Sequence, residues 1–186
     1  ELKKLEADLI KYQGKGIKLA HAHQQMRLDD KRFDGIYDIS ERLGKPLYIH
    51  TGTSPNPYTR MEPPYVDPLY LEESIKKYPG AIFIMGHSGY DSFLVKLTYL
   101  DSCIELAKKY ENVFIEPGAL GSRKASEILP IYLMRMKEEG IIDRVIYGSD
   151  GPQFPGYTAS HLNNMIDAME EVGYTGLEMK AVLESN

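Results

Sequence analysis

The stretch "LYIHTG", residues 47–52, is an apolar β-type run that ends on a histidine, His50. Two further runs end on a polar residue in the same way: "IFIMGH" ends at His87, and "RVIYGSD" ends at Asp150. A buried polar side chain needs a hydrogen-bond partner or a ligand, because burying it unpaired costs free energy. The three endings therefore predict that the strand ends share one polar site.

Strand-like and helix-like patterns alternate around these endings, which is typical of βαβ units with a parallel sheet. Strands are expected at 16–20, 45–50, 81–87, 112–118 and 143–150. Helices are expected at 29–44, 67–80, 92–110, 123–139, 158–173 and from 175 onward. The strands are apolar throughout, which predicts a sheet covered on both faces. Two architectures fit this order: a doubly wound open sheet, or five consecutive units of a (β/α)₈ barrel.

Several local signals mark the limits of these elements. Asp67 before Pro68 is expected to cap a helix, and Gly44 to end one. "TGLE" at 175–178 has the pattern of a capping box. The Pro-rich stretch 53–66 follows a strand and is expected to be a loop that shapes a pocket. Neither a GxGxxG nor a Walker loop follows any strand, which disfavours a nucleotide-binding sheet.

Length and composition limit the possible classes of protein. The 186 residues are expected to form a single domain, 1–186, but a full barrel typically needs about 250 residues. We therefore interpret the chain as a piece of a longer barrel domain. A net charge of −5 without a basic cluster disfavours nucleic acid as a partner. No run approaches the ~20 apolar residues of a membrane span, and a lone cysteine, Cys103, predicts a reducing, cytoplasmic location.

The three polar strand endings have the chemistry of a metal site. Parallel strands deliver their carboxyl ends to the same edge, so His50, His87 and Asp150 are expected to converge. Two imidazoles and a carboxylate suit Zn²⁺ or a similar divalent ion. Such an ion lowers the pKa of bound water from about 15.7 to about 7, and a carboxylate can accept the proton. Taken singly, each histidine has a structural alternative as a hydrogen-bonded residue, and Asp150 has one as a turn or helix cap.

Five stretches, in this order, resemble the amidohydrolase superfamily, in particular the amidohydrolase-2 group of metal-dependent barrels. They are "GIKL" with "DD" downstream, "LGKPLYIHTG", "DPLYLEESIKKYPGAIFIMGHSG", "KYENVFIEPG" and "DRVIYGSDGP", and together they cover about residues 14–152. The tail "MKAVLESN" is similar to the last segment of the family before its C-terminal helix. The resemblance implies a (β/α)₈ TIM barrel of which this chain carries roughly strands 4–8. Strands 1–3, with the H-x-H pair of the family, are then expected upstream of Glu1.

The resemblance also implies roles for the three polar endings. His50 is expected to be a metal ligand. His87 is expected to be a second ligand or a substrate-activating acid/base, and Asp150 both a ligand and the general base toward water. The cofactor is expected to be a divalent metal, with Zn²⁺ the first choice.

Three further residues are candidates for contact with a substrate. The resemblance implies that His21, just after "GIKL", lines the mouth of the pocket. Arg60 is the single cation of loop 53–66 and could bind a substrate carboxylate, although solvation at the surface is its alternative. Tyr90, just after "GHSG", is a candidate for the pocket rim.

Other assignments remain open for residues near the same strand ends. His21 and His23 could form the H-x-H pair themselves, although the "GIKL" before them matches strand 4. Lys18 could be a carbamylated lysine that bridges two metals, as in some barrels of this kind. Glu116 could contact the pocket or make a hydrogen bond in the interior.

The expected function is a metal-dependent hydrolase that activates water for attack on an amide, lactone or related bond of a small molecule. The first alternative is a metal-dependent decarboxylase or hydratase of a small aromatic carboxylic acid; "GHSGYDS" lacks the Gly-Gly pair that decarboxylases of the family tend to have. The second is an inactive half-barrel. A half-barrel exposes two sheet edges, so a homo-oligomer or the missing strands are expected to cover them. Neither nucleic acid nor a membrane is expected as a partner.

Overall fold

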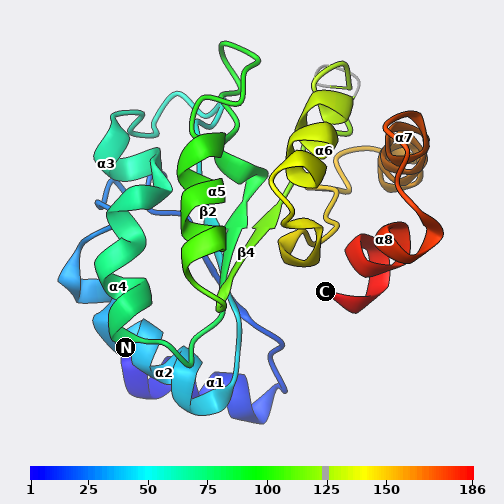
Figure 1. Cartoon of the computed structure of the whole chain (residues 1–186). Helices are drawn as coiled ribbons and strands as arrows, with labels where there is room; N and C mark the ends of the chain where they lie inside the picture. The colour runs from blue at the N-terminus through cyan, green and yellow to red at the C-terminus, as the bar shows by residue number, and fades with distance from the viewer. Residues whose placement is uncertain (123–125) are drawn as a thin grey trace.

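Four parallel strands form the centre of the protein in the computed structural model, which describes residues 1–122 and 126–186 (Figure 1). The strands are β1 (Ile17–Leu19), β2 (Leu47–His50), β3 (Phe83–Gly86) and β4 (Val113–Glu116), paired in the order β1-β2-β3-β4. Neighbours in the sheet are also neighbours in the sequence. The strand order therefore does not reverse as it does in a doubly wound sheet, and it matches the wall of a barrel.

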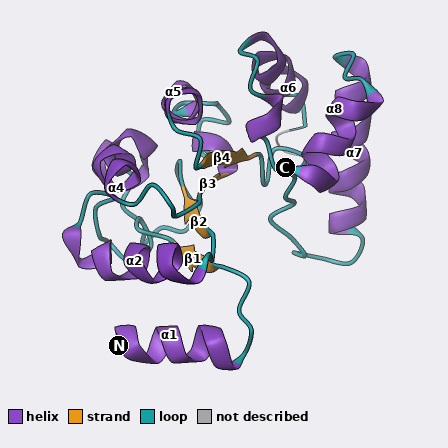
Figure 2. Ribbon diagram, turned by 60° about the horizontal axis from the view of Figure 1, so that its bottom comes forward, coloured by secondary structure: helices purple, strands orange, loops and turns teal. Residues whose placement is uncertain are grey.

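Helices alternate with the strands and continue beyond β4 (Figure 2). The α-helices are α1 (Leu2–Lys11), α2 (Asp34–Leu43), α3 (Pro63–Val66), α4 (Glu72–Lys77), α5 (Leu100–Lys109), α6 (Leu129–Glu138), α7 (Tyr157–Glu171) and α8 (Gly176–Lys180). Short 3₁₀ turns lie at Lys31–Phe33, Pro68–Leu71, His87–Gly89 and Ile142–Arg144, and a π-helical turn at Ala181–Ser185. Within the described ranges, no helix has the length and apolar character that crossing a bilayer demands.

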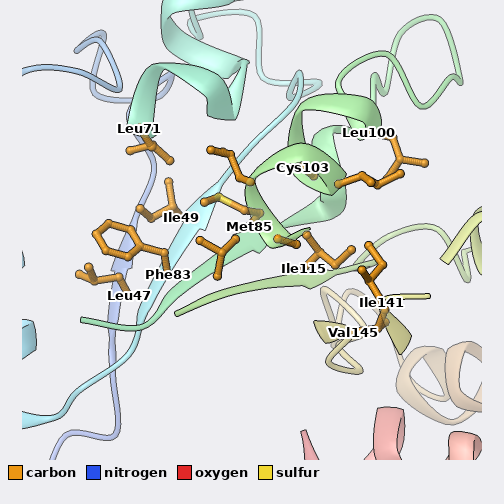
Figure 3. Packing of buried hydrophobic residues seen from close by; sticks show 14 of the residues in the cluster. Leu47, Ile49, Leu71, Phe83, Met85, Leu100, Cys103, Ile115, Ile141 and Val145 are labelled. Carbon is orange, nitrogen blue, oxygen red and sulfur yellow. The ribbon is translucent and has the colours of Figure 1, made fainter. Parts of the chain in front are cut away.

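The hydrophobic core lies between the sheet and the helices on one of its faces (Figure 3). Ile49, Met85 and Ile115 of three strands are fully buried, as is Cys103 of α5. Each large aliphatic side chain buried in this way contributes about 1.5–3 kcal/mol. The intervening strand positions Tyr48, Ile84 and Phe114 are only half-buried. The prediction of a sheet covered on both faces holds for one face only: that face packs on helices, and the other borders a hollow lined by Tyr48 and Ile84, among other residues.

Most of the predicted helix limits are confirmed. The Asp67 carboxylate accepts a hydrogen bond from the Leu69 amide at 3.1 Å and so caps the Pro68–Leu71 turn. Gly44 ends α2 with a φ of 59°, and Thr175–Glu178 forms the capping box. Helix α6 begins only at Leu129, with Pro130 in its first turn. Of the expected helix 123–139, residues 123–125 lie outside the described part of the chain.

The helix expected over 92–110 begins at Leu100, eight residues late. The Asp91 carboxylate accepts hydrogen bonds from the amides of Phe93 (2.9 Å) and Leu94 (3.0 Å), and Asp91 pairs with Lys96 in an antiparallel bridge. These local bonds compete with helix formation, which is a known effect of aspartate side chains. Phe93 is consequently 53% exposed instead of facing the core.

The strand expected over 143–150 is reduced to a single parallel bridge between Val145 and Ile115. The Ile146 amide donates to the Ile115 carbonyl at 2.9 Å, but the Tyr147 amide donates to the Val182 carbonyl near the C-terminus. This second bond takes the backbone away from a sheet ladder. The segment still follows the edge of β4 and brings Asp150 to the end of the sheet where the strands finish.

Candidate functional site

A cavity of about 790 Å³ lies beyond the carboxyl ends of the strands. It is lined by residues in the last part of the strands and in the segments that follow them, namely Lys18, Ala20, His23, His50, Thr53, Ser54, Pro55, His87, Tyr90, Ser92, Ala119, Ser122, Asp150, Gln153, Phe154 and Tyr157. The register explains why they meet: His50 is paired with Gly86, and Gly86 with Glu116, so these strands end at one level. The volume suits a small molecule.

His50, the last residue of β2, sits at the centre of a group of imidazoles. Its ring centroid lies 4.6 Å from that of His87 and 5.1 Å from that of His23, both edge to face. Nε2 of His50 is buried and has no hydrogen-bond partner in the described part of the protein. Burial lowers the pKa of His50 to about 2, with smaller contributions from His87, Lys18 and His23. The ring is therefore neutral and offers a free nitrogen, as a metal ligand requires.

His87 follows β3 and is held at two points. Its backbone amide donates to Oε2 of Glu116 at 3.1 Å, and its Nδ1 lies 3.2 Å from the Gly118 carbonyl oxygen. A carbonyl oxygen only accepts hydrogen bonds, so Nδ1 carries the proton of the neutral ring. The lone pair of Nε2 is then free, which is the state that the histidine ligands of metals adopt.

The turn that carries His87 is left-handed at three consecutive residues: φ is 67° at His87, 48° at Ser88 and 71° at Gly89. Hydrogen bonds stabilise this unusual conformation. The Gly89 amide donates to the Thr51 hydroxyl at 3.0 Å, and the Ser88 hydroxyl donates to that of Tyr132 at 3.2 Å. Non-glycine residues adopt positive φ values mainly where the surrounding structure enforces them, often at functional sites.

Asp150 lines the same cavity but stands apart from the two histidines. It is exposed and has a φ of 55°, and the Gln153 side chain donates to its backbone carbonyl at 3.1 Å. Among the residues that the structure describes, no three His, Cys, Asp or Glu side chains are close enough to hold one metal ion. The structure thus brings His50 and His87 into contact and places Asp150 on the cavity wall. The donor set itself fits a divalent ion: a buried, unpartnered imidazole nitrogen, a second imidazole and a carboxylate.

The three residues predicted to contact substrate lie in different environments. Tyr90 lines the cavity and is 5% exposed. Arg60 is exposed and bonded to Glu62 at 2.7 Å, with its guanidinium 4.7 Å from the Tyr65 ring centroid. His21 is fully buried, packs on Phe33, and has Nε2 3.2 Å from the Tyr37 hydroxyl. Neither Arg60 nor His21 is among the described residues that line the cavity.

The histidine on the cavity wall is His23 and not His21, which was predicted there. Lys18 also lines the cavity, with Nζ 3.8 Å from the Tyr48 ring centroid, and partial burial lowers its pKa. Tyr157 on α7 was missed; one turn later, His161 accepts a hydrogen bond from the Gly121 amide at 3.0 Å. The predicted helix began at Thr158, one residue late, so the i,i+4 spacing of Tyr157 and His161 on one helix face went unused.

The burial of His21 predicts a pH-dependent stability. Burial lowers the pKa of His21 to about 4 from its ordinary 6.5, and Asp30 opposes the shift. Between these values the unfolded chain binds a proton that the folded chain excludes. The contribution of neutral His21 to the free energy of unfolding is therefore complete above pH 6.5. It is lost as the pH falls toward 4, by up to about 3 kcal/mol. Urea unfolding at pH 7 and 4.5 is expected to show a smaller loss in His21→Gln than in the wild type. Equal losses would contradict this assignment.

A wall of parallel strands with helices on its outer face, and with polar side chains beyond the strand ends, is the arrangement of TIM-barrel enzymes. The chain belongs to the amidohydrolase family, since the family model described as Amidohydrolase matches residues 1–186. No curated protein matches the chain.

Solved structures support the barrel fold. An uncharacterized TIM-barrel protein from Bordetella bronchiseptica superposes with a TM-score of 0.73 at 16% identity, covering 99% of this chain and 59% of that one. A probable 2-pyrone-4,6-dicarboxylic acid hydrolase from Acinetobacter baumannii gives 0.65 at 17% identity, with 99% and 66% covered. A 2,6-dihydroxybenzoate decarboxylase from Rhizobium gives 0.63 at 15% identity, with 97% and 63% covered. The chain thus spans less than two thirds of each of these structures.

Proposed function

We propose that this protein is a metal-dependent hydrolase of small molecules in which His50, His87 and Asp150 hold a divalent ion, with Zn²⁺ the first choice. The observation that carries the proposal is the buried Nε2 of His50, which has no partner in the described structure and lies beside the ring of His87. We further propose that β1 to β4 and the segment 143–150 correspond to strands 4 to 8 of the complete barrel. The remaining ligands would then come from the strands that precede them.

Each residue of the site has a separate role in the proposed reaction. When bound, a divalent ion would lower the pKa of water at this site to about 7. His50 remains neutral because it is buried, and the Gly118 carbonyl keeps the proton of His87 on Nδ1. The carboxylate of Asp150 accepts the proton of the attacking water as general base. Tyr90 and Tyr157 wall the cavity and exclude bulk water from the substrate.

The cavity favours a compact substrate with an amide, lactone or related bond. A hydrolase and a decarboxylase both occur among the similar structures. Hydrolysis is our choice because an exposed carboxylate on the cavity wall is placed to take a proton from water, and because a serine follows His87 where a Gly-Gly pair is typical of decarboxylases in the family. Release of CO₂ from aromatic acids is the outcome that would replace it.

Metal analysis of the full-length protein tests the proposal. His50→Ala is expected to lower the Zn²⁺ affinity by at least the ~10–100-fold that the loss of a ligand's supporting partner causes. His21→Gln, a buried histidine outside the cavity, is the matched control and is expected to leave the affinity unchanged. Zn²⁺ binding would be measured by competition with a chromophoric chelator, and turnover with panels of lactones, amides and aromatic acids. Equal affinity in His50→Ala and the wild type would sink the proposal.

A further inference from the structure

Glu116, the last residue of β4, is a carboxylate that the proposed reaction leaves without a role. It is 3% exposed. Its Oε2 accepts two hydrogen bonds, from the Tyr48 hydroxyl at 2.6 Å and from the His87 backbone amide at 3.1 Å. A buried carboxylate is retained at a high desolvation cost, so a side chain with two such bonds needs an explanation beyond packing.

The surroundings of Glu116 are shaped to hold the carboxylate in one position. A Cβ at Gly148 would overlap Oε1 of Glu116, and a Cβ at Gly118 would lie 2.6 Å from the same oxygen. Tyr48 fixes the other oxygen, and Lys18 lies over the Tyr48 ring with Nζ 3.8 Å from its centroid. The carboxylate therefore has little freedom to move away from His87.

His87 depends on the end of β4 for both of its anchors. Glu116 binds its backbone amide, and the carbonyl of Gly118, two residues further on, binds its Nδ1. The first bond holds the backbone of His87 at a φ of 67°, and the second sets the direction of the ring. Loss of the first bond would let the backbone relax and carry Nδ1 away from Gly118.

We infer that Glu116 is a positioning residue, which fixes the tautomer and orientation of the His87 imidazole through the His87 backbone amide. The inference rests on the proposed function in so far as His87 acts in that site. Glu116 itself touches neither the ion nor the substrate in this scheme. The requirement is an acceptor oxygen at the position of Oε2, and the negative charge is secondary.

The direct test is the ¹⁵N spectrum of the histidine rings in the metal-free, full-length protein, at a pH where the rings are neutral. The wild type is expected to show His87 as a single Nδ1–H tautomer. Glu116→Ala is expected to give a mixture of both tautomers. Glu116→Gln keeps an acceptor oxygen and is expected to restore the single tautomer. Glu41→Ala, which removes a carboxylate that accepts a hydrogen bond from the Gly80 backbone amide before β3 begins, is the matched control and is expected to leave the His87 signals unchanged.

The second readout is kcat and KM, measured with a substrate that the wild type converts. Glu116→Ala is expected to lower kcat by about 10–100-fold, the range for supporting partners of ligands, with KM little changed, and Glu116→Gln to recover most of it. If Glu116→Ala does not fold, Glu116→Asp replaces it, since the side chain of aspartate is one C–C bond of about 1.5 Å shorter and withdraws the carboxylate from the His87 amide. His87 signals identical to the wild type in Glu116→Ala, or in Glu116→Asp where it replaces that variant, would overturn the inference. The spectra need neither metal nor substrate, so failure of the proposed function would show separately, as unchanged Zn²⁺ affinity in His50→Ala.

Discussion

Asp150→Asn is expected to lower kcat by about 10²–10⁴-fold, the range that a general base contributes. The amide has the same shape as the carboxylate but cannot accept a proton from water. Asp150 is exposed, and its backbone conformation is one that asparagine also tolerates, so the thermal stability is expected to remain unchanged. Steady-state kinetics, with the substrate found in the panels, and a thermal melt would measure the two effects.

Asp143→Asn is the control for Asp150→Asn. Asp143 is also an aspartate of the segment after α6, its side chain is 68% exposed, and it lies outside the cavity beside Arg144. Its replacement is expected to change neither kcat nor stability. Undiminished kcat in Asp150→Asn would contradict the role of general base and would favour a purely structural role for this turn.

Gly52→Ala is expected to have the largest effect on stability, a loss of about 2–5 kcal/mol. Gly52 has a φ of 77°, and a Cβ on it would overlap the backbone carbonyl oxygen of Tyr90. The Thr53 amide donates to that same carbonyl at 3.0 Å, so the loops after β2 and β3 approach each other closely here. A methyl group would push apart two loops that wall the cavity. Urea unfolding would measure the loss, which is a large part of the ~5–15 kcal/mol of a typical domain.

Gly140→Ala separates the two causes of this loss. Gly140 has a similar φ of 71°, but a Cβ there would meet no atom within 4 Å. Only the backbone cost of about 1–2 kcal/mol is then expected. If Gly52→Ala lost no more stability than Gly140→Ala, the close approach of the two loops would be refuted.

The sequence was sufficient for the parallel strands β1 to β4, because each is a short apolar run between clear turn signals. It was also sufficient for the contact between His50 and His87, because strand ends in a parallel sheet share one edge. The prediction failed for residues 92–99. Apolar residues at helical spacing predicted a helix there, but the hydrogen bonds that Asp91 accepts hold the backbone in another conformation. The Asp91 side chain binds the backbone amides of Phe93 and Leu94, and the spacing of apolar residues carries no information about such bonds.

The choice between His21 and His23 shows a second limit. Both follow β1 and differ in sequence by two positions, yet one is buried against Phe33 and the other lines the cavity. The direction of each side chain depends on the turn after β1 and on the packing of Phe33 and of Tyr37 in α2. The sequence around the two histidines does not specify this packing. The strand expected at 143–150 failed for a similar reason, because the backbone bond from Tyr147 to Val182 joins segments far apart in sequence.

The left-handed turn at His87–Gly89 also bears on how this family can diversify. Two of its three residues, His87 and Ser88, are not glycine, and each costs about 1–3 kcal/mol in this conformation. The hydrogen bonds that the turn donates to the hydroxyls of Thr51 and Tyr132 help to offset this cost. A mutation at Thr51 or Tyr132, neither of which lines the cavity, is expected to destabilise this turn and so to displace the His87 imidazole. Substitutions that change substrate specificity are therefore expected at residues of the cavity wall, such as Phe154, and not at Thr51 or Tyr132, which stabilise this turn.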